Sequence, residues 1–402
     1  MTSTKRRALI IQEAMGGCGR HVVDLVTGLD PDRFDVTLIH GTSRIDDYYR
    51  DALPRMAEHA RIIPCDDLVR PISPKHELKA LREVTRVIRE FKPETVHCHS
   101  SKAGVIGRMA VLLAGRRAGV RRVFYTPHAY SFQAPEFGGR KRTVFVGLER
   151  WMSRHATTLT FNVSAGERDA ALAERLDDPA KFEVVYNGVA DVPVPSRDEA
   201  RALLGLDTLG VPAGAPVVGV TARLVEQKDP LTAVGVMRRV LAERPDAHLV
   251  MIGDGDLEDA VRATVADAGI EDHVHLLGYR PDAERVVAAF DVYLLSSLYE
   301  GMPYSLVEAL RAGVPIAATD TTGNDEVVTD GVNGRLFPVG DAESGAKAVL
   351  DLLEHPMPAG RVRGTYLERF TLDRMLETIT ARYEGVPPTT GGTGRKDEEE
   401  RA

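Results

Sequence analysis

The clearest indication of the fold is the stretch SSLYEGMPYSLVEALRAGVPIAATD, residues 296–320. It starts where an apolar run ends, passes through a Gly-x-Pro turn, continues with a helical pattern and finishes in a second apolar run. A strand, a helix and a strand in this order are typical of a parallel sheet with a crossover helix. Glu300 lies just before the turn and Glu308 lies inside the helix. Carboxylates on both sides of such a turn indicate either helix capping or a bound ligand.

The two glutamates favour a ligand over capping alone. Ser305 and Glu308 match the S-x-x-E capping box, in which the glutamate only satisfies backbone donors. Glu300 lies outside the helix, so capping does not explain it. A helix N-terminus attracts anions through its free N–H groups, and Gly301 permits close approach of the backbone. The turn at 301–306 is therefore predicted to receive a diphosphate, with Glu308 on the ribose and Glu300 on a sugar.

The same alternation of apolar runs and helical patterns extends along the whole chain. The predicted strands are residues 7–12, 35–40, 94–100, 121–128, 158–164 and 182–189, then 215–222, 248–254, 273–279, 292–297 and 315–320. Near-continuous Val/Ile/Leu strands separated by helices indicate parallel sheets buried on both faces. The proline-rich stretch at 191–195 separates the two series and is the predicted linker. The fold class is therefore α/β with two doubly wound domains, and ligands are expected beyond the carboxyl ends of the strands.

Composition sets further limits. The chain has 402 residues, of which 43% are hydrophobic and 27% charged, as in a soluble protein of two ordinary domains. No apolar run approaches the roughly 20 residues that span a bilayer, and the N-terminus does not resemble a secretory signal. Three widely spaced cysteines suit a reducing cytosol. The formal charge is +7 over residues 1–190 and −15 over the remainder, so an anionic partner is expected on the N-terminal side.

Three further motifs follow predicted strands. In TARLVEQKDP, the cations Arg223 and Lys228 suit a phosphate group, and the alternative is a solvated loop. In EAMGGCGRH, a glycine pair suits close approach of a ligand, although the G-x-G-x-x-G fingerprint is absent. In IGDGDLED, Asp254 and Asp256 form either a divalent-metal motif or the acidic start of a helix, and the second is favoured.

Histidines occur at the ends of two predicted strands. His97 and His99, in VHCHS, point to one face of a strand. Such an H-x-H pair can bind zinc, but no third ligand is obvious in the sequence, and polar satisfaction at a strand end is favoured. His128, in YTPHAYSF, follows the next strand and could hydrogen-bond a sugar or a developing charge.

The segment at 138–156, GGRKRTVFVGLERWMSRHA, predicts a basic amphipathic helix. Val144, Leu148 and Trp151 lie at helical spacing. The flanking cations are Arg140, Lys141, Arg142, Arg150 and Arg154. Such a helix either lies on an anionic membrane surface or packs its apolar side on the core, and the second is more common.

In their order along the chain, these motifs resemble the retaining glycosyltransferases of family 4. The resemblance rests on E-G-x-P…E-A-L-x-A-G-V-P-I from Glu300, on A-R-L…Q-K-D-P from Ala222, and on G-D-G-x-L, VHCHSSKAG, YTPHAYSF and VVYNGV. It covers about residues 7–385, and the ordered set is far more specific than any one motif. Gly-Cys-Gly-Arg stands where Gly-Gly-Ala-Glu is commoner, so acceptor contacts near Cys18 and Arg20 are in doubt.

The resemblance implies the GT-B fold, with two Rossmann-like domains facing across a cleft. The implied division is residues 1–190 for the acceptor, 191–369 for the nucleotide sugar, a helix at 370–386 that crosses back to the first domain, and a disordered tail at 387–402. The polar composition of that tail independently predicts disorder.

The resemblance also implies roles for single residues. Arg223 and Lys228 would hold the diphosphate and stabilise the leaving-group charge. Glu300 would position the donor sugar, His128 would reach it from the N-terminal domain, and Glu308 would bind the ribose. The other implied donor-binding positions are Gly16, Gly17, Tyr279, Arg280, Gly301, Met302, Pro303, Tyr304, Ser305 and Leu306. No metal or other cofactor is implied, because the cations and the helix N-terminus replace it.

The predicted activity is transfer of a hexose or N-acetylhexosamine, with retention, from a nucleotide sugar to a hydroxyl acceptor. A UDP-sugar is favoured as donor, and a lipid-linked or polysaccharide precursor as acceptor. The expected location is the cytoplasm, with peripheral contact with the inner membrane surface as an option, and no nucleic acid is expected. The alternatives are a natural-product glycosyltransferase, a sugar-nucleotide epimerase or phosphorylase, and a non-catalytic nucleotide-sugar-binding partner of another transferase.

Overall fold

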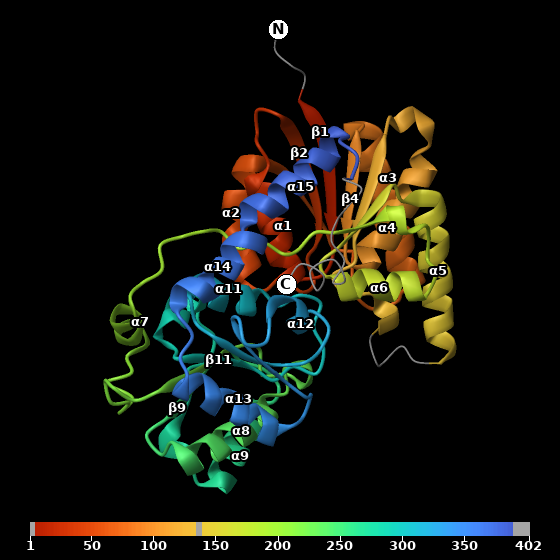
Figure 1. Cartoon of the computed structure of the whole chain (residues 1–402). Coiled ribbons are helices and arrows are strands. Elements are labelled where there is room, and N and C mark those ends of the chain that lie inside the picture. The colour runs from red at the N-terminus through yellow and green to blue at the C-terminus, as the bar shows by residue number, and fades with distance from the viewer. Residues whose placement is uncertain (1–4, 134–138, 389–402) are drawn as a thin grey trace. The chain divides into compact units, whose positions relative to one another are not determined.

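The computed structural model describes residues 5–133 and 139–388, and it divides into two units (Figure 1). Unit 1 comprises the residues up to Asn187 together with those from Asp373 onward, and unit 2 comprises Gly188–Leu372. Each unit contains one parallel sheet covered by helices, which confirms the predicted α/β fold class. The tail predicted at 387–402 lies almost entirely outside the described residues.

Unit 1 is built on a sheet with the strand order β3-β2-β1-β4-β5-β6-β7. The strands are β1 (Arg6–Gln12), β2 (Phe34–Gly41), β3 (Ala60–Cys65), β4 (Thr95–His99), β5 (Arg122–Thr126), β6 (Leu159–Asn162) and β7 (Phe182–Val184). The helices are α1 (Gly17–Gly28), α2 (Asp47–His59), α3 (Pro74–Phe91), α4 (Ser101–Ala114), α5 (Arg140–Ala156), α6 (Ala165–Ala173) and α15 (Leu372–Glu384). In Figure 1, α1, α2 and α15 cover one face of this sheet, and α3, α4 and α5 cover the other.

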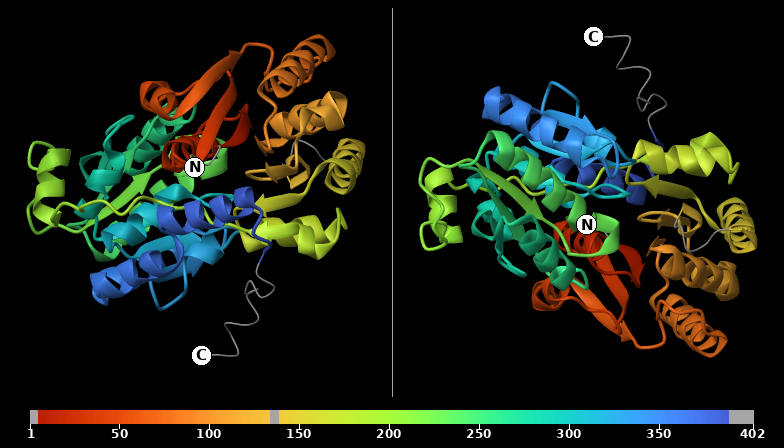
Figure 2. Two further views of the ribbon diagram at one scale, coloured as in Figure 1. Left: turned by 90° about the horizontal axis from the view of Figure 1, so that it is seen from above. Right: turned by 90° about the horizontal axis from the view of Figure 1, so that it is seen from below.

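Helix α15 packs on unit 1 although it follows unit 2 in the sequence. It lies beside the strands at the start of the chain in Figure 1 and in the left view of Figure 2. The hydroxyl of Tyr383 is 2.7 Å from Nδ1 of His97, and Arg382 forms an ion pair with Glu183. A Cβ at Gly28 would lie 2.3 Å from Cδ1 of Leu376, so α1 and α15 meet at a glycine. Buried aromatic and charged contacts therefore hold this helix to the sheet.

Unit 2 has the strand order β10-β9-β8-β11-β12-β13. The strands are β8 (Val217–Thr221), β9 (His248–Ile252), β10 (Val274–Leu276), β11 (Val292–Leu295), β12 (Ile316–Thr319) and β13 (Gly334–Phe337). The helices are α7 (Arg197–Leu204), α8 (Pro230–Glu243), α9 (Glu258–Ala268), α10 (Ala283–Val286), α11 (Tyr304–Ala312), α12 (Asn324–Val327), α13 (Ala342–Glu354) and α14 (Ala359–Arg369). Val, Leu and Met side chains of β8, β9 and β11 form its core with α8 and α13.

In both sheets the strand order reverses beside the first strand. The reversal lies between β1 and β4 in unit 1 and between β8 and β11 in unit 2. In doubly wound sheets the ends of the two connecting loops separate at such a switch point, which leaves a ligand-sized crevice at the carboxyl ends of the strands. The loops after these four strands are therefore the first places to look for a site.

A hollow of about 950 Å³ lies elsewhere, at the amino ends of β1 and β2. Its charged lining residues are of both signs: Lys5, Arg7, Asp35, Glu58, Arg61 and Glu94. It opens at the opposite edge of the sheet from the switch point, so it does not belong to the site described below.

Buried His248 makes unit 2 sensitive to acid. Burial and the neighbouring His275, His273 and Arg201 lower the pKa of His248 to about 4, although Asp246 opposes the shift. A histidine with a lowered pKa adds full stability above its unfolded pKa of about 6.5 and loses that contribution as the pH falls toward 4. At pH 5 the loss is about 2 kcal/mol relative to pH 7.5. We expect His248→Gln to narrow the difference in Tm between these pH values, measured by calorimetry. An unchanged difference would contradict this.

Candidate active site

An ion pair bridges the switch point of unit 2. Lys228 follows β8 and Glu300 follows β11, and the Lys228 ammonium donates a hydrogen bond to Oε1 of Glu300. The Glu300 side chain is only 6% exposed and the Lys228 side chain 18%. Lys228 and Glu300 are 72 positions apart, and the sequence predicted a donor contact for each of them separately. They meet at the switch point, where the topology leaves a crevice.

Serine and threonine hydroxyls fix the loop that carries Glu300. Ser297 donates to Oε1 of Glu300 at 2.6 Å, and Ser296 donates to the carbonyl of Asp229 at 2.7 Å. Thr319, at the end of β12, donates to the carbonyl of Ser297 at 2.6 Å. The sequence analysis did not identify these residues. The signal was present, because the two serines lie three and four residues before Glu300, and short hydroxyl side chains after a strand favour local hydrogen bonds.

Helix α11 begins beside this ion pair and presents an open N-terminus. Its N-cap is Pro303, and no side chain among the described residues caps it. The capping box considered from the sequence is therefore wrong, since Ser305 lies inside the helix and its side chain hydrogen-bonds Tyr293 instead. Glu308 is buried one turn into the helix. The dipole and the first-turn N–H groups remain suited to an anion.

The turn between Glu300 and α11 offers backbone rather than side chains. The side chain of Met302 in the turn is buried, and so are those of Tyr304 and Leu306 in the first turn of α11, which leaves the backbone to meet a ligand. A second glycine, which the sequence analysis missed, supports the turn from the other side. Gly323 has φ +86°, and a Cβ there would lie 2.4 Å from the carbonyl oxygen of Gly301. The two glycines allow the segments before α11 and α12 to lie in contact.

The loop that carries Arg223 is fixed by contact with the glycine turn at Gly253 and Gly255. The guanidinium of Arg223 is exposed, and no ion pair or hydrogen bond of that group occurs among residues 5–133 and 139–388. The backbone beside it is fixed, because Leu224 donates to the carbonyl of Asp254 at 2.7 Å and Leu257 donates to the carbonyl of Leu224 at 2.9 Å. The G-D-G segment thus positions the Arg223 loop, and the acids of D-x-D precede α9.

Gly253 is the tightest point of this contact. Its φ is +137°, and a Cβ would lie 2.0 Å from the carbonyl oxygen of Ala222. We expect Gly253→Ala to lower the stability of unit 2 by about 2–4 kcal/mol through strain and overlap, and to reduce transfer by moving Arg223.

The matched control is Gly269→Ala at the end of α9. Gly269 has φ +65° with nothing within 4 Å of the added Cβ, so about 1 kcal/mol of strain is expected there. Thermal unfolding and kcat/KM of both variants test the idea, and equal effects on both would show that the contact has no special role.

The loop after β10 carries Tyr279 and Arg280. Tyr279 is 46% exposed. Arg280 forms a bidentate ion pair with Asp282, at 3.0 and 2.9 Å, and also donates to the carbonyl of Leu203. The hydrogen bonds that Arg280 donates to the Asp282 carboxylate raise the pKa of Arg280. The guanidinium is thus engaged within unit 2, which leaves the exposed ring of Tyr279 and the backbone as the parts that could meet a base.

In unit 1, Gly16 and Gly17 lie where β1 passes into α1. Gly16 is the N-cap of α1 with φ +67°, and no side chain of the described residues caps the helix. The N–H of Gly16 donates to Oδ2 of Asp46 at 2.8 Å. A Cβ at Gly16 would have nothing within 4 Å, so open space adjoins the backbone here, as close ligand approach requires.

His128 lies after β5 in a backbone conformation that non-glycine residues rarely adopt. Its φ is 52° and that of Ala129 is 80°. Oε1 of the buried Glu167 accepts a hydrogen bond from the N–H of Ala129 at 2.5 Å, and Oε2 accepts from the N–H of Val163 at 2.8 Å. The carboxylate of Glu167 therefore stabilises the strained turn.

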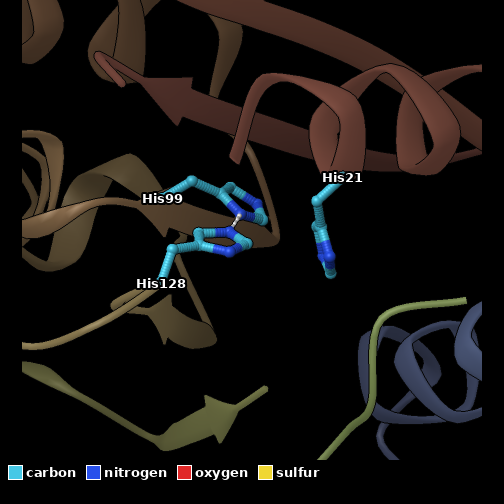
Figure 3. A group of neighbouring side chains, drawn as sticks. All are labelled: His21, His99 and His128. Atoms are coloured by element: carbon cyan, nitrogen blue, oxygen red, sulfur yellow. Dashed lines mark hydrogen bonds between the residues drawn. The ribbon is translucent and has the colours of Figure 1, made fainter. Parts of the chain in front are cut away.

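Three histidines meet at the carboxyl ends of the central strands of unit 1 (Figure 3). We call His21, His99 and His128 the histidine cluster. His99 Nδ1 and His128 Nε2 are 3.2 Å apart, and the ring of His21 lies 4.8 Å from that of His128 between centroids. Burial is the main cause that lowers the pKa of all three, to about 4 for His21 and well below 6.5 for His99 and His128. The rings are therefore neutral at pH 7. The sequence analysis named His99 and His128 but not His21.

Two protein-family models match the chain. The model described as glycosyl transferases group 1 matches residues 207–364, in unit 2. The model described as glycosyl transferase 4-like domain matches residues 16–188, in unit 1. Together they include every site residue that the sequence predicts, from Gly16 to Glu308.

Similar proteins are found over most of the chain. The UDP-Gal:alpha-D-GlcNAc-diphosphoundecaprenol alpha-1,3-galactosyltransferase of Escherichia coli is 29% identical, over 80% of this chain and 81% of that protein. The 2-deoxystreptamine N-acetyl-D-glucosaminyltransferase of Streptomyces fradiae is also 29% identical, over 76% of this chain and 74% of that protein. Among solved structures, HepE of Anabaena in complex with UDP and glucose has a TM-score of 0.78, at 20% identity, over 94% of this chain and 99% of that one. This last likeness shows the fold.

Proposed function

The chain belongs to the group 1 glycosyl transferases, with a glycosyl transferase 4-like first domain, and from this premise we propose a specific reaction. The protein transfers a hexose or N-acetylhexosamine from a UDP-sugar, with retention, to a hydroxyl of a lipid-linked glycan precursor. Family membership makes the protein a glycosyltransferase, so the epimerase, the phosphorylase and the non-catalytic partner considered from the sequence are not proposed.

The observation that carries the proposal is the Lys228–Glu300 pair beside the uncapped N-terminus of α11. In the absence of a donor, the two charges satisfy each other. When a nucleoside diphosphate binds, its phosphates attract Lys228 and the exposed Arg223. The N–H groups at the start of α11 donate hydrogen bonds to the remaining phosphate oxygens. Glu300 is then released toward the sugar hydroxyls, and Glu308 binds the ribose.

These same groups account for catalysis. The bond to the diphosphate breaks with charge developing on the leaving group, and Lys228, Arg223 and the helix N-terminus stabilise that charge. A UDP-sugar is the proposed donor because the E. coli relative is named for UDP-Gal. His128, neutral at pH 7, contacts the donor sugar, as the resemblance to the family implies. No metal is required in this scheme.

Retention proceeds by attack on the face from which the diphosphate leaves. A phosphate oxygen of the donor, rather than a carboxylate of the enzyme, takes the acceptor proton. Once Lys228 has moved to the phosphates, Glu300 keeps its hydrogen bond from Ser297 and serves to orient the sugar. Mass spectrometry of enzyme incubated with a slow donor analogue should find no glycosyl adduct on Glu300, and finding one would refute this mechanism.

The lipid-linked acceptor is supported by the outer face of α5 as well as by the E. coli relative. Val144 is 68% exposed and Trp151 44%, so this apolar stripe faces outward rather than toward the core. Arg140 and Lys141 have no charged or hydrogen-bonded partner among the described residues, and we propose that they contact anionic lipid. The other three cations bind residues 174–176, directly after α6: Arg142, Arg150 and Arg154. No described helix is long and apolar enough to cross a bilayer.

A second candidate acceptor is an aminocyclitol. The Streptomyces fradiae relative, which acts on 2-deoxystreptamine by its name, matches this chain as closely in identity as the E. coli relative does. Its acceptor is a small soluble molecule with several hydroxyls, and such an acceptor would not need the α5 face.

One experiment separates the two acceptors. The full chain is incubated in EDTA with UDP-Gal, UDP-Glc or UDP-GlcNAc, and with either GlcNAc-diphosphoundecaprenol in detergent or 2-deoxystreptamine. We expect a disaccharide-lipid product by mass spectrometry. Product from 2-deoxystreptamine alone would establish the second candidate. Absence of product from both, with free nucleotide appearing, would contradict both acceptor classes.

A further inference from the structure

The histidine cluster contains polar atoms that the transfer reaction does not explain. His21 is on α1, His99 ends β4 and His128 follows β5, so all three converge at the switch point of unit 1. Figure 3 shows His99 and His128 joined by their hydrogen bond, with His21 directed toward the same space from the helix. One ligand nitrogen from each residue lies within 4.8 Å of the others.

Two of these rings carry buried nitrogens with no partner among the described residues. They are Nε2 of His21 and Nε2 of His99, on side chains that are 1% and 0% exposed. An unsatisfied buried nitrogen costs free energy, and native structures contain few of them. An ion bound to Nε2 of His21 would satisfy that nitrogen, whereas Nε2 of His99 is not the nitrogen that lies 3.2 Å from His128.

We propose that His21, His99 and His128 bind one divalent transition-metal ion of the zinc class. Neutral imidazole is a preferred ligand of Zn²⁺, and three histidines with one open position form a recurrent tetrahedral site. A Zn–N distance of about 2.0–2.1 Å places tetrahedral ligand nitrogens about 3.3 Å apart. His99 Nδ1 and His128 Nε2 already lie at 3.2 Å. The third nitrogen, from His21, lies within 4.8 Å of these two and must move closer when the ion binds.

Neighbouring residues define which histidines participate. Oδ1 of Asn187 lies 3.1 Å from Nδ1 of His21 and orients that ring, as outer hydrogen bonds do in metal sites. The ring of His97 lies 3.9 Å from that of His99 between centroids, tilted by 39°, but does not join the site. Its two nitrogens are occupied by Tyr383 and Thr126, at 2.7 and 2.8 Å. The site therefore has three protein ligands.

The ion goes beyond the proposed function, because transfer itself requires none. An ion on His128 would remove that ring from the donor sugar, so occupancy should inhibit the enzyme. This consequence rests on the proposed role of His128, whereas the binding of the ion does not.

The test uses tag-free, EDTA-stripped and dialysed full chain titrated with Co²⁺, whose visible absorption reports tetrahedral coordination. We expect one Co²⁺ ion to bind per chain. The affinity for Co²⁺ should be more than tenfold weaker in His21→Asn and in His99→Gln, and about 10–100-fold weaker in Asn187→Ala. The matched control is His275→Asn in unit 2, which removes a ring nitrogen 3.1 Å from Nδ1 of His248 and should leave the affinity for Co²⁺ at the histidine cluster unchanged. Circular dichroism confirms that each variant is folded.

Each outcome has a separate meaning. No visible band, or a band that persists in folded His21→Asn and His99→Gln, would overturn the metal site. Inhibition of transfer by Zn²⁺ that EDTA reverses would support both the site and the role of His128. Binding of Co²⁺ without inhibition would support the site and contradict the role of His128 in the proposed function.

Discussion

Replacing Lys228 with alanine is expected to lower kcat for sugar transfer by about 10²–10³-fold, the usual loss when a group that stabilises leaving-group charge is removed. The ammonium lies at the switch point of unit 2 and is paired with the nearly buried Glu300, and the exposed Arg223 retains only part of the charge stabilisation that we propose for the two cations together. Lys228→Ala also leaves Glu300 without its partner, which should cost about 1–3 kcal/mol of stability. Steady-state kinetics and thermal unfolding measure the two effects separately.

Lys347→Ala is the matched control for this variant. Lys347 also forms an ion pair with a glutamate in unit 2, Glu343, at 2.7 Å, but both side chains are highly exposed. Exposed pairs contribute little, so both activity and Tm should remain unchanged. Full transfer activity in Lys228→Ala would show that the candidate site is wrong.

Replacing Glu308 with glutamine is expected to nearly abolish transfer through loss of donor binding. The buried carboxylate, one turn into α11, is proposed to accept hydrogen bonds from two ribose hydroxyls. Hydrogen bonds to a charged acceptor contribute about 1.5–3 kcal/mol each, so losing two weakens the donor about a hundredfold or more. Glutamine has nearly the same shape, so the fold should be retained. Calorimetric titration with UDP measures the effect.

Glu284→Gln provides the control at the other end of the same helix. Glu284 pairs with Arg311, in the last turn of α11, at 3.4 Å. This change perturbs the helix without touching its N-terminus, so UDP affinity should be unaltered. Equal loss of UDP binding in both variants would mean that helix integrity, and not the Glu308 carboxylate, is what was measured.

The central strands of both sheets were predictable because of how they are buried. β1, β9 and β11 are covered on both faces, and this requires the continuous apolar runs that the sequence displays. β3 and β13 were missed. They are edge strands of their sheets, each only partly buried; β3 contains Pro64, and β13 is only four residues long. Edge strands carry charges, prolines and short runs that weaken the pattern.

The part of the site in unit 2 was predictable for a different reason. Arg223, Lys228, Glu300 and Glu308 each follow a strand of one sheet, and parallel strands bring their carboxyl ends to one edge. The capping box, which the sequence offered as the alternative to a ligand, does not form, because α11 begins after Pro303 and Ser305 lies inside the helix. Sequence pattern alone does not fix such a boundary to within one residue.

The histidine cluster was only half predictable. His99 and His128 stand at strand ends, but His21 is in a helix 78 positions before His99, and the strand order alone brings the two together.

The outward direction of Val144 and Trp151 on α5 could not be predicted from the sequence either. Their helical spacing suits a core face, yet the side that packs on the sheet carries Val146 and Met152 instead.

The most direct test of the donor site is a calorimetric titration of the full chain, in EDTA, with UDP, GDP, ADP and their common sugars. We expect UDP and one UDP-sugar to bind, and their binding to be lost or strongly weakened in Lys228→Ala and Glu308→Gln while Lys347→Ala binds normally. Binding that survives in both site variants, or a folded protein that binds none of these nucleotides, would contradict the assignment of the site.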